Sequence, residues 1–264
     1  MNKLISVLKS VWNYFIYLLY PPHCPSCDKV TGYRIEGEMC SECHKAFIDE
    51  FVTVCPKCGL KAELCECSTD SLGGDSDRSP YTTMHPIIFS GYYVGYNDDS
   101  VVGSLVFRMK RDEESSAKYV FARMIAQCLS RYCVLNKIDL TDFVLTYIPR
   151  SKDSIEKYEF DHMKYVSKIV SKMLGCKCGS YFIRKGGTAQ KELSYEERIK
   201  NARLSIHLNP KKVAHIRGTK FIVIDDIITT GSTMATAISK LSFAGADVII
   251  PAAAMISKTF KKAD

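Results

Sequence analysis

Two adjacent carboxylates follow an apolar run near the C-terminal end of the 264-residue sequence. The run reads FIVIDDIITTGSTM, and Asp225 and Asp226 lie at its centre. Ionised carboxylates only accept hydrogen bonds, so a pair of them suits a ligand with neighbouring hydroxyl groups. A turn of small residues follows the acids and consists of Thr229, Thr230, Gly231, Ser232 and Thr233.

The small-residue turn leads into a predicted helix at 233–243. The free N–H groups and the positive dipole end of a helix N-terminus favour a phosphate. Gly231 allows the backbone to approach such an anion closely. A ligand that combines a diol with a phosphate is a ribose 5-phosphate. The alternative is that the acids cap a helix and the turn has no ligand.

The surrounding elements must bring these groups to one edge of a sheet. Apolar patterning predicts a strand and turn at 86–96, strands at 143–148, 221–224 and 248–254, and helices at 118–135, 153–174 and 233–243. This alternation predicts an α/β fold with a mainly parallel sheet and helices on both faces. Ligands of such sheets bind beyond the carboxyl ends of the strands. Pro149, Arg150 and Ser151 fall at one such end and the acid pair at another.

Eight of the 12 cysteines lie in a small module near the N-terminus. They form four close pairs: Cys24 and Cys27, Cys40 and Cys43, Cys55 and Cys58, and Cys65 and Cys67. Such pairs supply the four thiolates of a tetrahedral Zn²⁺ site, which is closed and therefore structural. We expect one or two zinc ions, with disulfides or an iron–sulfur cluster as alternatives. Spacing leaves open whether the pairs combine in sequence order or interleave.

The charges are unevenly distributed along the chain. Residues 1–80 hold 8 Lys and Arg against 11 Asp and Glu, whereas residues 81–264 hold 28 against 18. An anionic ligand, phosphate or nucleic acid, therefore fits the second part better, unless its basic residues form only a solvated surface. Thiolates would make the metal-loaded module more acidic still, which favours an interaction or scaffold role over autonomous DNA binding.

The composition predicts four segments: an N-terminal amphipathic helix at 1–20, a double zinc ribbon at 21–70, a linker at 71–85 and the α/β domain at 86–264. The apolar stretch at 4–20 is interrupted by Lys9 and has no small-residue cleavage site, so we expect neither a signal peptide nor a stable membrane span. This helix is expected to dock on the rest of the protein, or else to touch a membrane or partner. Reduced thiols fit a cytoplasmic location.

The segment at 221–234 resembles the phosphoribosyl pyrophosphate loop of type I phosphoribosyltransferases. The resemblance extends over nearly the whole chain to the ComF family of competence-associated proteins, through the stretches YPPHCPSC, SLVFRMK and VLTYIPRS. A further family pattern is matched by Arg184, Gln190, Leu193, Arg198 and Asn201. Where the family commonly has Arg-Gly-Phe-Asn-Gln, this chain has Tyr-Glu-Phe-Asp-His at 158–162, a departure that bears on acceptor recognition and turnover.

The resemblance implies binding of phosphoribosyl pyrophosphate together with Mg²⁺. It implies that 229–233 hold the 5-phosphate, that Asp225 and Asp226 face the ribose hydroxyls, and that 149–151 meet the pyrophosphate. Arg184 and Lys185 precede a Gly186-Gly187 pair that suggests a closing flap acting in catalysis, with a solvated basic surface as the alternative. His162 is a candidate general base, with a surface or packing histidine as the alternative.

Two classes of function follow from the resemblance. The first is an enzyme that transfers phosphoribose to a nitrogen acceptor. The second is a non-catalytic protein of DNA uptake, which would hold single-stranded DNA or a phosphoribosyl ligand and work with a helicase-like partner. A regulator that senses phosphoribosyl pyrophosphate is a third possibility.

Overall fold

The computed structural model describes residues 11–12, 14–32, 37–53, 79–93, 100–185 and 202–257. The chain divides into two compact units, the first made of Met1–Glu50 and Tyr96–Val120 and the second of Phe51–Gly95 and Phe121–Asp264. Residues 96–120, which the sequence pattern assigns to the α/β domain, group with the cysteine-rich segment. The boundary between the units falls inside helix α4 (Ala117–Leu135).

The first unit contains helices α2 (Ser41–Glu50) and α3 (Val101–Arg111). The last residue of α2, Glu50, is hydrogen-bonded to the first turn of α3. The Glu50 carboxylate accepts hydrogen bonds from the backbone N–H groups of Val101 and Val102, both at 3.1 Å. It also accepts the hydroxyl proton of Ser100, whose Oγ in turn accepts from the Gly103 N–H. An acid and an N-cap at the first turn stabilise a helix, so the end of α2 fixes the start of α3.

The described part of the N-terminal segment is helical at 11–12 and 14–19. Its large apolar side chains are exposed, namely Val11, Trp12, Tyr14, Phe15, Ile16, Leu18, Leu19 and Tyr20. The Tyr17 hydroxyl donates to the Thr31 carbonyl at 3.5 Å. Most of this segment is therefore not docked on the described residues. Among the described helices, none has the length and hydropathy needed to cross a membrane.

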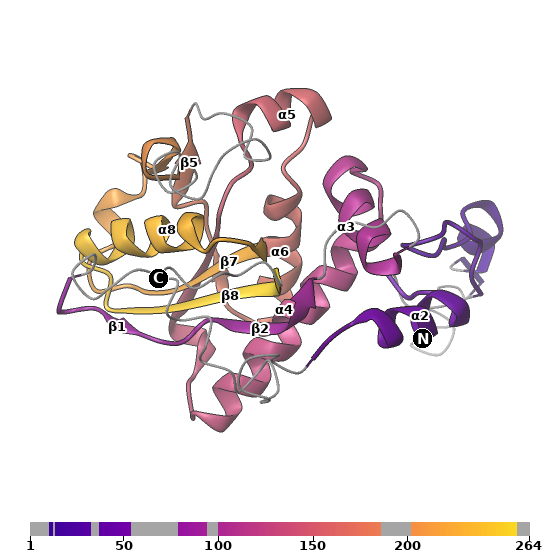
Figure 1. The fold of residues 1–264 in the computed structure, drawn as a ribbon, viewed down its shortest axis with the longest axis horizontal. Coiled ribbons are helices and arrows are strands. Elements are labelled where there is room, and N and C mark those ends of the chain that lie inside the picture. The colour runs from indigo at the N-terminus through magenta and orange to yellow at the C-terminus, as the bar shows by residue number, and fades with distance from the viewer. Residues whose placement is uncertain are drawn as a thin grey trace, which may run out of the picture. The chain divides into compact units, whose positions relative to one another are not determined.

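The second unit is built on a six-stranded sheet (Figure 1). Its strands are β1 (Thr83–Met84), β2 (Ile88–Tyr93), β3 (Phe143–Tyr147), β4 (Lys177–Cys178), β7 (Lys220–Ile228) and β8 (Val248–Ser257). The order is β1-β8-β7-β3-β4, β2 also pairs with β8, and every pairing is parallel. The predicted α/β class with a mainly parallel sheet is confirmed.

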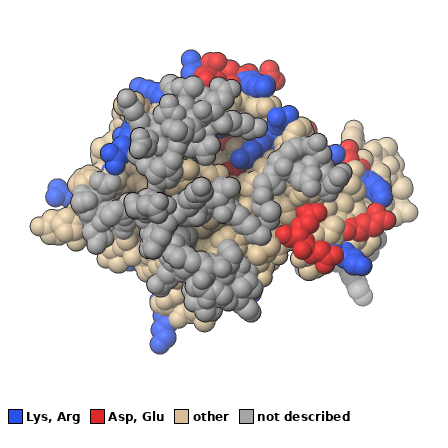
Figure 2. Space-filling view, viewed as in Figure 1, with Lys and Arg blue, Asp and Glu red and all other residues tan. Residues whose placement is uncertain are grey.

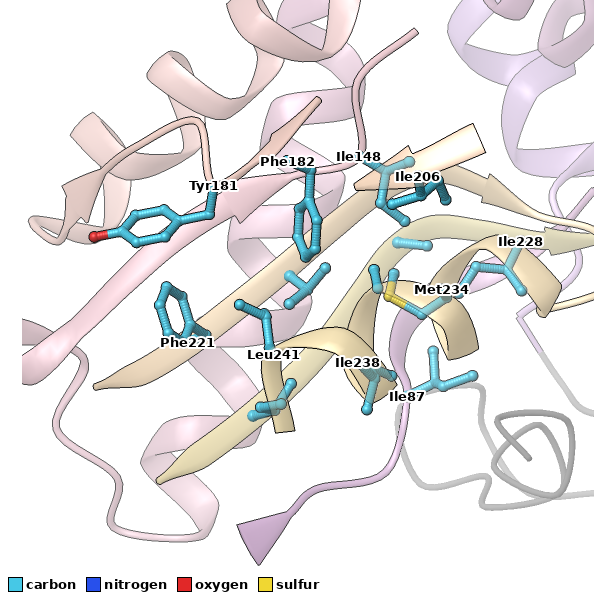
Figure 3. Close-up of a cluster of buried hydrophobic side chains, with 14 of the residues drawn as sticks. Ile87, Ile148, Tyr181, Phe182, Ile206, Phe221, Ile228, Met234, Ile238 and Leu241 are labelled. Atoms are coloured by element: carbon cyan, nitrogen blue, oxygen red, sulfur yellow. The ribbon is translucent and has the colours of Figure 1, made fainter. Parts of the chain in front are cut away.

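One face of the sheet packs under helix α8 (Ser232–Phe243) and under the antiparallel pair β5 (Phe182–Arg184) and β6 (Ile206–Leu208). In Figure 3, Met234, Ile238 and Leu241 of α8 lie in one buried cluster with Phe221 of β7 and Phe182 of β5. Burial of such side chains is the main stabilising contribution to this unit.

The opposite face packs against α4 and α6 (His162–Leu174), as Figure 1 shows. The Ser90 hydroxyl of β2 donates to the Met124 carbonyl of α4 at 2.8 Å. On α6, Met163, Val166 and Val170 are buried. Helices therefore cover both faces, as expected for parallel strands whose side chains are apolar on both sides.

The helix predicted at 153–174 is instead two helices, α5 (Lys152–Tyr158) and α6. Glu159 adopts a left-handed conformation with φ of 62° and ends α5. Asp161 then caps α6 by accepting the Met163 N–H at 3.0 Å. Apolar periodicity continues across the break, so the pattern alone did not reveal the left-handed residue. Helix α3 and the pair β5–β6 were not predicted either.

Candidate functional site

Four thiols come together in the first unit. The sulfur atoms of Cys24, Cys27, Cys40 and Cys43 all lie within 4.8 Å of one another. The Sγ atoms of Cys27 and Cys40 are 3.8 Å apart. A tetrahedron with metal–sulfur bonds of about 2.3 Å has edges of about 3.8 Å, whereas a disulfide bond is only about 2.05 Å long. The cluster therefore fits a metal such as Zn²⁺, bound by four thiolates.

The backbone around the first cysteine pair forms a tight turn. The Cys24 N–H donates to the Lys29 carbonyl at 2.9 Å, and Asp28 takes a left-handed φ of 65°. The Cys40 N–H donates to the Cys24 sulfur at 3.4 Å, and α2 begins directly after Cys40 and carries Cys43. The first two pairs in the sequence thus combine in sequence order.

The protonation of these thiols differs before a metal binds. Burial raises the pKa of Cys24, but hydrogen bonds from backbone groups of Cys27, Cys40 and Ser26 outweigh it and lower that pKa to about 7. Burial also raises the pKa of Cys43, and the neighbouring thiols add to this increase. Thiolates are the metal ligands, so binding must release protons and affinity must fall as the pH falls.

The second set of four cysteines, Cys55, Cys58, Cys65 and Cys67, lies outside the described residues. A second zinc ion therefore stays a prediction. Cys128 and Cys133 are buried within α4, as their helical pattern indicated.

The acid pair lies where β7 extends past its neighbour β3. Pairing with β3 ends at Ile224, whereas pairing with β8 continues to Ile228. Successive side chains of a strand point to opposite faces, so the two acids diverge. Asp225 is partly exposed, and Asp226 is only 6% exposed.

Asp225 has Arg184 in its vicinity. Burial lowers the pKa of Arg184, and the negative charge of Asp225 opposes that shift. The Arg184 Nε is buried and has no hydrogen-bond partner among the described residues. The neighbouring Lys185 has an exposed side chain, and its N–H donates to the Ser205 carbonyl at 2.8 Å. The charge of Asp225 thus acts on Arg184, while residues 186–201, with the rest of the expected flap, lie outside the described residues.

Asp226 faces helix α6. Its Oδ2 lies 3.1 Å from the Nε2 of His162, and both side chains are buried. Its Oδ1 accepts the Ile227 N–H at 2.7 Å. Both carboxylate oxygens of Asp226 thus have protein partners, and His162 is a buried histidine in contact with Asp226. The expected contact of Asp226 with a ribose hydroxyl and the candidate role of His162 as a general base stay predictions.

The segment 149–151 follows β3 and lies beside α6. The Arg150 N–H donates to Asp161 Oδ2 at 3.4 Å, and Ser151 caps α5. The Arg150 guanidinium carbon lies 4.4 Å from the ring centroid of Tyr158 and 5.8 Å from that of Phe160. These aromatic contacts orient a flat, forked cation near the end of β3.

The small-residue turn begins α8 with Gly231 at φ of 74° as its N-cap. The hydroxyl oxygens of Thr230 and Ser232 are 2.8 Å apart. Thr229 is exposed, Thr233 is partly exposed, and Ser232 is buried. The expected turn and helix start are therefore both present, with the helix one residue longer than predicted.

No protein-family model matches this sequence, and no curated protein is significantly similar to it.

The Asp161 carboxyl of this site should affect how stability depends on pH. Burial raises its pKa, and this effect outweighs the opposing influence of His162 and of the N–H groups of Arg150, Met163 and Lys164. A raised folded-state pKa means that the stabilising contribution is complete below the unfolded-state pKa of about 3.9 and is lost as the pH rises through the folded-state pKa.

Asp161→Asn should therefore be at least as stable as the wild type at pH 7, and its free energy of unfolding should decline less between pH 4 and 7. Urea unfolding at a series of pH values measures this. Asp139→Asn is the opposite control, because hydrogen bonds from Thr141 lower the pKa of exposed Asp139. An unchanged pH slope in Asp161→Asn would contradict the prediction.

Proposed function

We propose that the second unit binds phosphoribosyl pyrophosphate with Mg²⁺ and transfers its phosphoribosyl group to a nitrogen acceptor. One observation carries this proposal: a single segment presents the Asp225 carboxylate at the sheet edge and then enters α8 through the Gly231 turn. One continuous stretch of backbone thereby holds a carboxylate that can accept hydrogen bonds from hydroxyl groups and a helix N-terminus that can bind an anion.

The proposed roles follow from the contacts. The turn at 229–233 binds the 5-phosphate, and Asp225 accepts hydrogen bonds from the ribose hydroxyls. The charge of Asp225 raises the pKa of Arg184, which supports a position of Arg184 near the ligand. Arg184 would bind the pyrophosphate together with Arg150. Mg²⁺ would be held largely by the substrate oxygens.

Such a transfer needs no covalent bond between the protein and the substrate. Departure of pyrophosphate leaves an oxocarbenium-like carbon, so catalysis consists of neutralising the leaving group and orienting the acceptor. Arg150, which follows β3, and Arg184, the last residue of β5, are suited to neutralising the leaving group, because a guanidinium binds phosphate oxygens in a forked geometry.

Single-stranded DNA is supported less well as the ligand. On the face shown in Figure 2, the described Lys and Arg side chains form separate groups instead of one continuous basic surface. Sequence-independent binding of single strands requires a basic groove with aromatic platforms. A role in DNA uptake through phosphoribosyl ligand binding without turnover stays compatible with the same contacts.

Calorimetric titration with phosphoribosyl pyrophosphate, with and without Mg²⁺, tests the binding. We expect binding that strengthens with Mg²⁺ and is competed by ribose 5-phosphate. Pyrophosphate release in the presence of ammonia or nucleobases then separates an enzyme from a binding protein. The absence of any heat of binding at millimolar ligand would refute the proposal.

Gly231→Ala should weaken ligand binding about tenfold and lower stability by about 1 kcal/mol, because an alanine at positive φ is strained and shifts the turn. Gly175→Ala is the matched control. Gly175 has φ of +70° at the C-cap of α6, and an added Cβ there meets no atom within 4 Å. The control should lose similar stability while keeping wild-type affinity. Equal affinities in both variants would exclude the turn from the binding site.

A further inference from the structure

We infer that the N-cap and the first residue of α6, Asp161 and His162, act as a clamp that sets the spacing between the two halves of the proposed binding site. His162 is thus a positioning residue that acts through Asp226. This inference rests on the proposed function, and it assigns the two neighbouring acids different roles. Asp225 contacts the ligand, and Asp226 anchors the strand that carries Asp225.

The clamp has one contact to each strand end. On one side, Asp161 accepts the Arg150 N–H and so holds the segment after β3. On the other side, His162 Nε2 lies 3.1 Å from Asp226 Oδ2 and so holds β7. Because both contacts come from consecutive residues at the start of α6, they couple the two strand ends beyond the point where the β3–β7 pairing stops.

The hydrogen bonds continue from Asp226 into the backbone beside Asp225. Asp226 Oδ1 accepts the Ile227 N–H at 2.7 Å, and the Asp226 N–H donates to Asp225 Oδ1 at 2.9 Å. Removal of His162 would take one hydrogen-bond partner from the buried Asp226 Oδ2, which costs free energy and favours a shift of this carboxylate. Its movement would displace the strand at the point where Asp225 must face the ligand.

The chemistry of the pair fixes the histidine tautomer. An ionised carboxylate only accepts hydrogen bonds, so His162 Nε2 carries the proton and donates it to Asp226. The other ring nitrogen, Nδ1, is buried and has no partner within the part of the chain that the structure describes. The clamp therefore depends on Nε2 alone.

Two substitutions separate the ring nitrogens. His162→Gln places an amide N–H near the Nε2 position and keeps a donor to Asp226. His162→Asn places its amide near Nδ1 and cannot reach Asp226. We expect His162→Gln to bind phosphoribosyl pyrophosphate within about threefold of the wild type and His162→Asn to bind it about tenfold more weakly, since one buried partner is removed.

The titrations should be run well below the melting temperature of each variant, with circular dichroism to show that it is folded. His215→Gln is the matched control, because His215 is exposed and precedes the start of β7, away from the acid pair. Its affinity should equal that of the wild type. A purely structural role for His162 would lower stability but leave the affinity of the folded protein unchanged.

Nitrogen-15 NMR of the wild type supplies a test that needs no variant. We expect His162 to be protonated at Nε2, with a slowly exchanging proton. Protonation at Nδ1 alone would overturn the inference, even if His162→Asn failed to fold. Equal affinity of folded His162→Asn and wild type would also overturn it while leaving the proposed function intact. A wild type that binds no phosphoribosyl pyrophosphate would overturn both.

Discussion

Removal of the metal from the four-cysteine site should unfold the first unit. Structural zinc contributes about 10–16 kcal/mol to the folding of zinc-finger peptides, which is comparable with or larger than the whole stability of a small domain. The site has the same closed four-thiolate chemistry, and Cys24 and Cys43 are themselves part of the buried interior. Chelation, or Cys43→Ser, should therefore abolish the protection of α2 and α3 amides in hydrogen exchange.

Cys133→Ser is the control for this prediction, because Cys133 is buried in α4 and lies outside the metal cluster. It should reduce the stability of the second unit modestly and leave metal content unchanged. Elemental analysis must show that zinc has been lost from the treated protein. Unchanged protection of α2 after confirmed loss would show that the metal is not structural.

Asp225→Asn should weaken binding of phosphoribosyl pyrophosphate at least about thirtyfold, or about 2 kcal/mol, because hydrogen bonds to a charged group contribute about 1.5–3 kcal/mol each. An amide can accept from one hydroxyl but cannot supply the negative charge. The melting temperature should change little, since Asp225 is partly exposed. Calorimetric titration with Mg²⁺ present measures the change in affinity.

Asp142→Asn is matched to this variant in charge and chemistry. Asp142 precedes β3 and is 68% exposed, and its Oδ2 lies 3.6 Å from the Lys220 ammonium at the start of β7. It therefore lies at the amino edge of the sheet, opposite to the acid pair. Its substitution should leave the affinity unchanged, and an equal loss in both variants would indicate a general charge effect instead of a site.

Local patterns in the sequence were sufficient to predict the mainly parallel sheet. The strands at 143–148, 221–224 and 248–254 and the helix after Gly231 are found within a few residues of their predicted bounds. Apolar runs and a glycine at positive φ are local signals, because they depend on neighbours in the chain. The break at Glu159 was missed, since a left-handed glutamate has no such signal.

The sequence by itself determined which residues could act: paired cysteines for a metal, an acid pair for hydroxyls and a small-residue turn for an anion. Only the tertiary structure decided how they combine. It joined the first two cysteine pairs, brought Arg184 to Asp225 and buried Asp226 against His162. The physical reason is that the chemical type of a residue and its local conformation depend on that residue and its neighbours in the chain. Contacts between residues far apart in the chain depend instead on how helices pack on strands.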